Sequence, residues 1–149
     1  MSSKLKALLI IGGVFLAMQL IVPSKTNPPT DKTKELIAPE NVTSVLKKAC
    51  YDCHSNETRW PWYTSVAPFS WIAATHVHEG RAWVNFSEWE NYEEANKTKL
   101  KKLIFRAVSH AMPPHAYKLM HKESELTAEE KKLLRDWTGV NPADISARD

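Results

Sequence analysis

The spacing of apolar residues along the chain predicts helices and no strand. From Pro39 to Cys53, apolar side chains recur at i, i+3, i+4 and i+7, the pattern of one buried helix face. A proline suits the first turn of a helix, because the donor it lacks would have had no partner there. The apolar positions of this helix are Val42, Val45, Leu46 and Ala49. No internal repeat and no alternating apolar and polar run is found, so the pattern predicts an all-α fold.

Three further helices are predicted downstream. One runs from Pro68 to His78 and ends near Gly80. A longer helix follows Ser87-Glu88-Trp89-Glu90, which matches a capping box, and its apolar face comprises Leu100, Leu103, Ile104, Ala107 and Val108. The last helix begins at a second capping box, Thr127-Ala128-Glu129-Glu130, and ends at Gly139. Residues 55–66 and 109–125, which contain prolines, are predicted to be irregular.

The N-terminus carries a short positive region followed by an apolar run. Lys4 and Lys6 precede an apolar segment from Ala7 to Val22 that only Gln19 interrupts, which is typical of a secretory signal. No Ala-x-Ala-like cleavage site follows, so we favour an uncleaved membrane anchor over a cleaved signal peptide. We therefore assign residues 1–22 to a signal peptide or anchor, 23–38 to a polar linker that acts as a tether, and 39–149 to the folded domain. The lysines are expected in the cytoplasm and the domain outside it, in the periplasm or at the outer face of the membrane.

The charge balance excludes one class of partner. Without residues 1–22 the chain has 18 basic and 17 acidic residues, a net charge of +1. This balance predicts no nucleic-acid partner. Lys97, Lys99, Lys101 and Lys102 lie close together, and we interpret them as a solvated helix face. A docking surface for an acidic redox partner is the alternative.

The most informative motif is Cys50-Tyr51-Asp52-Cys53-His54, the attachment site of a c-type haem. Two thiols separated by two residues can add to the two vinyl groups of one porphyrin, and the next histidine is placed to ligate the iron. A redox dithiol would need a βαβ context, a zinc site a second cysteine pair, and a disulfide leaves the histidine unexplained. The chain has no further cysteine, so we predict one covalent haem c with His54 as the proximal iron ligand.

Three solutions are open for the second axial position of the iron. Met112 is the preferred ligand, because it lies between two predicted helices, before Pro113 and Pro114, where an irregular backbone can aim a thioether at the iron. His76 shares a helix face with Ile72 and is the alternative ligand. An open or water-bound iron is the third solution. A core methionine and a structural histidine are the competing interpretations of these side chains.

Aromatic residues follow the attachment motif closely: Trp60, Trp62, Tyr63, Phe69 and Trp71. Flat apolar rings exclude water from a porphyrin, and indole or phenol groups can reach its propionates. We therefore expect these rings to form a wall around the haem, with Arg59 and Arg81 binding the propionates. The alternative is an ordinary small-domain core.

The order of the elements resembles class I cytochromes c. Those proteins have an N-terminal helix that ends in Cys-x-x-Cys-His, intermediate helices, a methionine loop and a C-terminal helix. Their first and last helices cross and pack, which implies contact here between Trp137 and Val42, Val45 or Leu46.

A wider set of short motifs extends over about residues 40–137. It comprises Cys50 to Asn56, Trp60-Pro61-Trp62-Tyr63, Ala67-Pro68, Ser70-Trp71, His76-Val77, Glu79-Gly80-Arg81, Asn85 to Trp89, Met112-Pro113-Pro114, Tyr117 and His121. This set resembles the bacterial haem-binding domain family of exported single-haem proteins. His110-Ala111 precedes the methionine here, where many members have Gly-Glu. The resemblance implies haem binding and redox work, without fixing which kind.

The function we expect is that of a monohaem c-type cytochrome that transfers single electrons to and from an unidentified redox protein. We expect no enzymatic activity, because no acid–base constellation surrounds Met112; His110 and His115 are the nearby candidates and are more simply explained as exposed. A haem-based ligand sensor or peroxidase-like domain with an open distal site is the second hypothesis. An adhesion or assembly module with an incidental motif is the third.

Overall fold

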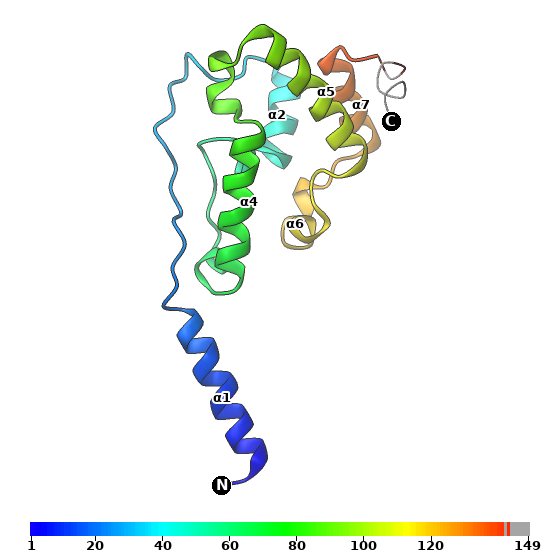
Figure 1. The fold of residues 1–149 in the computed structure, drawn as a ribbon. Helices are drawn as coiled ribbons and strands as arrows, with labels where there is room; N and C mark the ends of the chain where they lie inside the picture. Colours follow the sequence, from blue (N-terminus) through cyan, green and yellow to red (C-terminus); the bar gives the residue numbers. More distant parts are fainter. Residues whose placement is uncertain (142, 144–149) are drawn as a thin grey trace.

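The protein is helical over the part of the chain that the computed structural model describes, residues 1–141 and 143 (Figure 1). The all-α prediction is confirmed, since no strand occurs among these residues. The predicted domain reaches residue 149, so part of its C-terminal end lies outside the described residues. The α-helices are α1 (Ser3–Met18), α2 (Glu40–Ala49), α3 (Tyr51–His54), α4 (Phe69–Trp83), α5 (Glu94–His110), α6 (His115–Met120) and α7 (Ala128–Thr138). The 3-10 helices are η1 (Trp62–Ser65), η2 (Phe86–Asn91) and η3 (Lys122–Ser124).

Helix α1 projects away from the rest of the molecule (Figure 1). Ser2 caps its N-terminus through a hydroxyl that accepts a 3.3 Å hydrogen bond from the Leu5 amide, and the helix buries no side chain. An N-terminal helix is therefore present as predicted, but its 16 residues end at Met18 and leave residues 19–22 of the apolar run outside it. Within the described chain, no helix combines the length and apolar character that crossing a membrane requires.

The core of the domain lies between α2, α5 and α7. Helix α7 packs against both α2 and α5, so the first and last helices of the domain are in contact as predicted. The buried cluster includes Val42, Val45, Leu46, Phe86, Trp89, Leu100, Ile104, Val108 and Leu134. Trp137 is partly buried against this cluster, and the Lys101 ammonium lies 5.8 Å from the centre of its ring. The helix-face pattern in the sequence thus identified most of the core.

The second capping box is present and the first is not. The Thr127 hydroxyl accepts from the Glu130 amide, the Glu130 carboxylate accepts from the Thr127 amide, and Gly139 ends α7 in the left-handed conformation. Ser87, by contrast, lies inside η2, and its hydroxyl accepts a 3.0 Å hydrogen bond from the Asn56 amide. The long helix begins later, at Glu94, so the prediction of a cap at Ser87 is wrong.

Two other local differences concern the helices around the attachment motif. The predicted helix from Pro39 to Cys53 is interrupted at Cys50, whose backbone leaves the helical conformation between α2 and α3. Helix α4 does not end near Gly80 but continues to Trp83. A Cβ at Gly80 would lie 2.4 Å from the carbonyl oxygen of Cys53, so this glycine allows α4 to approach α3 rather than ending the helix.

Residues 19–36, which we call the strap, connect α1 to α2 in an extended path beside α4 (Figure 1). The strap covers most of the predicted linker, and hydrogen bonds fasten it to the domain. The Lys25 ammonium donates to the Ser65 hydroxyl at 2.8 Å, and the Asn27 amide group donates to the Thr58 carbonyl at 2.9 Å. Near its end, the Leu36 amide donates to the Phe86 carbonyl at 2.8 Å.

Candidate functional site

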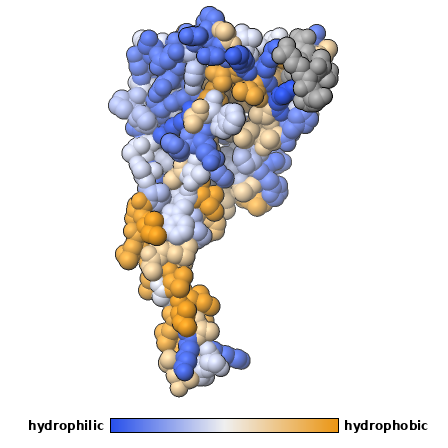
Figure 2. Space-filling view, in the orientation of Figure 1, coloured by the Kyte–Doolittle hydropathy of each residue, from blue (hydrophilic) through white to orange (hydrophobic). Residues whose placement is uncertain are grey.

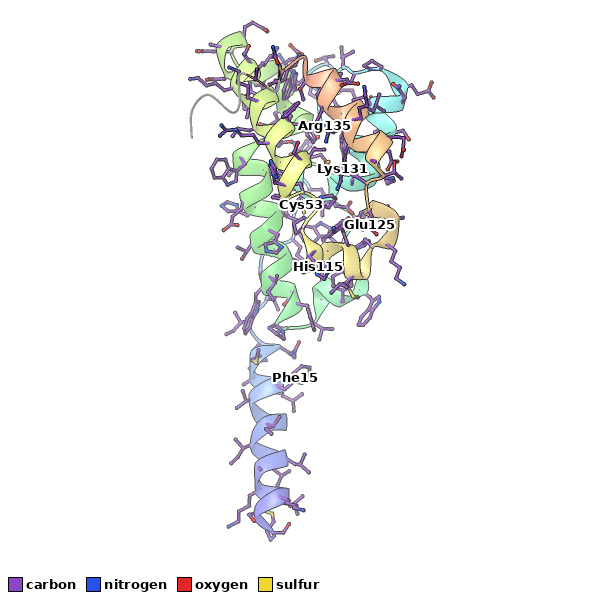
Figure 3. The ribbon with its side chains drawn as sticks, turned by 90° about the vertical axis from the view of Figure 1, so that its right-hand side faces the viewer. Phe15, Cys53, His115, Glu125, Lys131 and Arg135 are labelled. Carbon is purple, nitrogen blue, oxygen red and sulfur yellow. The ribbon has the colours of Figure 1, made fainter. Side chains whose placement is uncertain are left out.

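An apolar cavity of about 450 Å³ is enclosed mainly by α3, α4 and α5. Its volume lies within the roughly 300–1,000 Å³ typical of small-molecule and cofactor sites. The attachment motif contributes Cys50, Asp52, Cys53 and His54; α4 contributes His76, Glu79, Gly80 and Trp83; α5 contributes Leu100, Leu103, Ile104, Ala107 and Val108. Figure 3 marks Cys53 in the middle of the domain beside α4. The predicted attachment motif and the apolar face of α5 therefore meet at one cavity.

The two cysteines present free thiols to this cavity. Burial raises the pKa of Cys50 to about 12 and that of Cys53 to about 11, so both thiols are protonated at neutral pH. A redox-active Cys-x-x-Cys pair needs a lowered thiol pKa to supply a thiolate nucleophile. The environment of these cysteines therefore does not support a thioredoxin-like dithiol.

His54 is oriented by two backbone carbonyls at the C-terminal end of α4, those of Gly80 and of the cap residue Val84. Its Nδ1 lies 2.9 Å from the Gly80 oxygen and 3.2 Å from the Val84 oxygen, so Nδ1 carries the proton and donates it. Burial lowers the pKa of His54 by more than these hydrogen bonds raise it, which favours the neutral ring. A neutral imidazole with Nδ1–H occupied has Nε2 available as a metal ligand, the arrangement found where a histidine binds a metal.

Met112 and His76 both line the cavity. Met112 follows the end of α5, where its amide donates to the Ala107 carbonyl at 2.7 Å, and its side chain is 37% exposed. His76 is exposed and lies one helical turn before Gly80 on the cavity side of α4. The structure thus brings the preferred distal ligand and its alternative to the same site.

Asp52 connects the attachment motif to the segment after Met112. Its carboxylate accepts hydrogen bonds from Nε and Nη2 of Arg59, at 3.1 and 3.0 Å, and from the Tyr117 hydroxyl at 2.6 Å. Burial opposes ionisation of this carboxyl, but the hydrogen bonds from Arg59 and Tyr117 outweigh it and lower the pKa of Asp52. The Arg59 guanidinium is therefore already paired with a protein carboxylate, whereas we expected it to be available for a haem propionate.

Helix α6 is held over the site by polar and aromatic contacts. It has no buried residue, and Tyr117 is its link to Asp52. The Tyr117 ring stacks on His121 with centroids 4.4 Å apart, and Nε2 of His121 lies 2.6 Å from the Tyr63 hydroxyl. These contacts fix the position of α6, because the helix itself buries no residue.

The predicted aromatic wall lies elsewhere in the structure. None of the rings that follow the motif lines the cavity: Trp60, Trp62, Tyr63, Phe69 and Trp71. The Trp60 and Trp71 indoles donate to the strap, at Asn27 and at the Ile21 carbonyl, and Trp62 is 77% exposed. Residues 62–65 form η1 and Phe69 begins α4, and along this path the indoles of Trp60 and Trp71 meet the strap and not the cavity.

Arg81 also faces the strap and not the cavity. Its guanidinium donates to the carbonyls of Ser55 and Thr26, each at 2.7 Å, and to the side chains of Asn27 and Thr58. With these acceptors around it, Arg81 joins the strap to the segment that follows His54. The prediction that Arg81 binds a haem propionate is therefore not supported by its position.

The aromatic residues at the cavity are Trp83, Phe86 and Tyr117. Sequence reasoning missed Trp83 because it placed the end of α4 at Gly80. The signal was available, since His76, Gly80 and Trp83 follow the i, i+4, i+7 spacing of one helix face. Phe86 begins the short 3-10 helix η2, and Tyr117 lies in α6, within the stretch 109–125 that is predicted to be irregular. That prediction is wrong for residues 115–120, because a helix of six residues is too short to show a clear period in the sequence.

The donor set does not form a conventional metal cluster. Among the described residues, no group of three or more His, Cys, Asp or Glu side chains is arranged to hold a metal ion. The cavity instead offers two thiols, one oriented imidazole, a thioether and apolar walls. These groups fit a flat, apolar, iron-containing macrocycle bound through sulfur and nitrogen.

Comparison with known proteins agrees with this geometry. The family model described as a haem-binding domain matches residues 13–139, which include the strap, the cavity and α7. No curated protein and no solved structure matches the chain. The match extends over most of the sequence, and the chain therefore belongs to the haem-binding domain family.

Proposed function

We propose that the protein is a monohaem c-type cytochrome that carries single electrons. The observation that carries the proposal is the joint position of Cys50, Cys53 and His54 on one apolar cavity, with Nδ1 of His54 already bonded to backbone carbonyls. This set can attach a haem covalently and ligate its iron from one side.

The residues of the chain have separate roles in this proposal. Cys50 and Cys53 would hold the haem, each thiol adding across one vinyl group to form a C–S bond, with its hydrogen going to the neighbouring carbon. His54 ligates through Nε2, while the carbonyls of Gly80 and Val84 hold the ring in position. When bound, the haem supplies one-electron chemistry at its iron. The apolar face of α5 and the Trp83 ring of α4 exclude water, which favours the reduced state of lower charge.

Met112 is the distal ligand in this proposal. Its thioether lines the cavity, and the Tyr117–Asp52 hydrogen bond fastens the following helix to the attachment motif. Methionine ligation also favours a raised reduction potential. The expected signature is a weak sulfur-to-iron charge-transfer band in the oxidised protein. It should vanish in Met112→Ala and persist in His76→Ala. Its absence from the unmodified protein, together with a low-spin spectrum that His76→Ala alone converts to high spin, would assign the ligand to His76.

The proposed location is the periplasm or the outer face of the cytoplasmic membrane, reached through the N-terminal segment. Lys4 and Lys6 ahead of the apolar helix support export in that orientation. The partner is proposed to be a redox protein. Of the clustered lysines, Lys97 is paired with Glu90 and Glu94, at 2.6 and 2.9 Å, so Lys99 and Lys102 are the better candidates for contacting an acidic partner.

The proposal is tested by measuring whether the full chain binds haem covalently. The protein is produced with a c-type haem attachment system and analysed by pyridine haemochrome spectroscopy and by haem staining after denaturing electrophoresis. We expect one haem per chain, retained after denaturation, and none retained in the Cys50→Ser, Cys53→Ser double variant. Haem that is extracted from the unmodified protein by acidic acetone would contradict covalent attachment.

A ligand sensor or peroxidase-like domain is the second candidate function. The observation in its favour is the partial exposure of Met112, since a side chain that the core does not enclose can be displaced from an iron by an incoming ligand. Carbon monoxide binding distinguishes the two functions. Rapid binding to the ferrous protein at neutral pH supports the sensor, and an inert six-coordinate spectrum supports the carrier.

A further inference from the structure

The end of the domain nearest α1 exposes large apolar side chains. Trp62 in η1 is 77% exposed, and Phe69 and Ile72 at the start of α4 are 58% and 50% exposed. The strap adds Leu20, Ile21 and Val22, which are also exposed. We call these six residues the basal patch. Soluble surfaces rarely carry so many large apolar side chains together, and such patches mark interaction sites.

The basal patch is continuous with α1. Figure 2 shows hydrophobic residues over much of α1 and in a group where α1 meets the domain. Hydrophilic residues cover much of the opposite end of the domain. Helix α1 is apolar on all sides and buries nothing in the protein. A helix that is hydrophobic all round is stable where its whole surface is covered by other apolar matter, such as lipid. Its polar exceptions, Lys4 and Lys6, lie at the end away from the patch.

Gln19, the polar residue that interrupts the apolar run, fastens α1 to the domain. Its side chain accepts a 2.9 Å hydrogen bond from the Ala67 amide and donates to the Ala67 carbonyl at 3.3 Å. Trp71 adds a 2.8 Å hydrogen bond from its indole to the Ile21 carbonyl. The helix and the patch are therefore held in one orientation, which a free tether would not provide.

We infer that the basal patch is a lipid-contacting surface, with the interfacial region of a phospholipid bilayer as its partner. Sixteen helical residues rise about 24 Å, against a hydrocarbon core of about 30 Å. With α1 in lipid, the side chains just beyond its end lie at the remaining depth. Trp62 supplies an exposed indole, the ring type that gathers at the membrane interface, and Phe69 and Ile72 extend the apolar surface.

This inference sets the orientation of the haem domain on the membrane. Helix α4 runs from the basal patch at Phe69 to the cavity-lining Trp83, so the cavity is held above the lipid surface at a height fixed by α4. It rests on the proposed membrane location and not on the haem chemistry. A redox partner in or on the same membrane would meet the domain in one orientation.

Photo-crosslinking of the full, haem-loaded chain tests the inference. p-Benzoylphenylalanine is placed singly at Trp62, Phe69 and Ile37 in protein bound to vesicles of phosphatidylethanolamine and phosphatidylglycerol. Ile37 is the matched control, because it is 85% exposed and precedes α2 at the opposite end of the strap from α1. Adducts are identified by mass spectrometry. We expect lipid adducts at positions 62 and 69 and none at 37.

Phe15 on α1, labelled in Figure 3, is the positive control for lipid contact by the helix. Adducts at 15 without adducts at 62 and 69 would overturn the inference, and so would adducts at 62 and 69 to a second copy of the chain. No adduct at any position would also overturn it. Haem content, measured on the same samples, reports the proposed cytochrome function separately.

A second variant separates orientation from attachment. Gln19→Leu lengthens the apolar run and removes the hydrogen bonds to Ala67. We expect vesicle binding to be retained and lipid adducts at position 69 to be lost in large part, because the end of α1 is no longer joined to Ala67 and is left with the Trp71–Ile21 hydrogen bond. Unchanged crosslinking at 69 would contradict the role of Gln19.

Discussion

Aromatic residues occupy two regions of this domain, and the two differ in what surrounds the rings. At the cavity, Phe86 is buried against Tyr51 and Trp89, with ring centroids 5.6 and 6.5 Å away. On the strap side, Trp60 and Trp71 use their indole N–H groups to hold an extended segment. The same residue types thus build a core in one region and fasten a connector in the other. Composition alone could not assign them, because both uses draw on the same apolar rings and polar N–H groups.

The largest expected effect comes from removing the buried Phe86 ring, and removing the exposed Trp62 ring is the comparison. Phe86→Ala should lower the free energy of unfolding by about 3–5 kcal/mol, because the ring is fully buried and its loss leaves a cavity. Trp62→Ala should change it by about 0.5 kcal/mol or less, since that ring is exposed. Urea denaturation of both variants measures the difference, and equal losses would erase the distinction between the regions.

The close approach of α4 to α3 is tested at Gly80. Gly80→Ala should cost about 1–3 kcal/mol, because the added Cβ meets the backbone oxygen of Cys53 at 2.4 Å and backbone cannot move aside easily. It should also disturb the carbonyls that orient His54. Gly13→Ala is the matched control, because a Cβ there meets no atom within 4 Å. Denaturation and haem content are measured together, and a stable, fully loaded Gly80→Ala protein would contradict the packing described.

A substitution at Arg81 tests whether this side chain holds the strap or binds the haem. Arg81→Lys loses the forked donation to Thr26 and Asn27 and should destabilise the protein by about 1–2 kcal/mol. Limited proteolysis should cut the strap faster, while the haem spectrum stays unchanged. Arg135→Lys on α7 serves as the control. A shifted reduction potential with an intact strap would restore the original prediction of a propionate partner.

The smallest effect concerns the contact between α2 and α7. The Lys48 ammonium, 2.5 Å from the Glu130 carboxylate, lowers the pKa of that carboxyl from its usual value of 4.5. Because the folded pKa is depressed, the stabilisation is complete above about pH 4.5 and is lost as the pH falls through the folded value. Glu130→Gln should remove about 1 kcal/mol at neutral pH and less in acid.

Urea midpoints at neutral pH and at about pH 3 measure this difference. Glu129→Gln, in the same turn of α7 and exposed, is the control and should show little change. A loss for Glu130→Gln that is the same at both pH values would show that the charge contributes nothing.

The sequence by itself determined the attachment motif, the all-α class, the helix faces of α2, α5 and α7, and the cap at Thr127. These features are local, because helical periodicity and capping depend on residues three or four positions apart. Family membership follows from the same motifs.

Only the tertiary structure decided which rings face the cavity, why Gly80 is a glycine and how the strap is held. The contacts responsible join residues far apart in the chain, as when Arg81 donates to Thr26 or Tyr117 to Asp52. The residues after the motif show no helical period from which the direction of their side chains could be predicted. Trp60, Trp62 and Trp71 were therefore expected at the haem, although none of them lines the cavity. Their partners are set by packing across the whole fold and not by spacing along the chain.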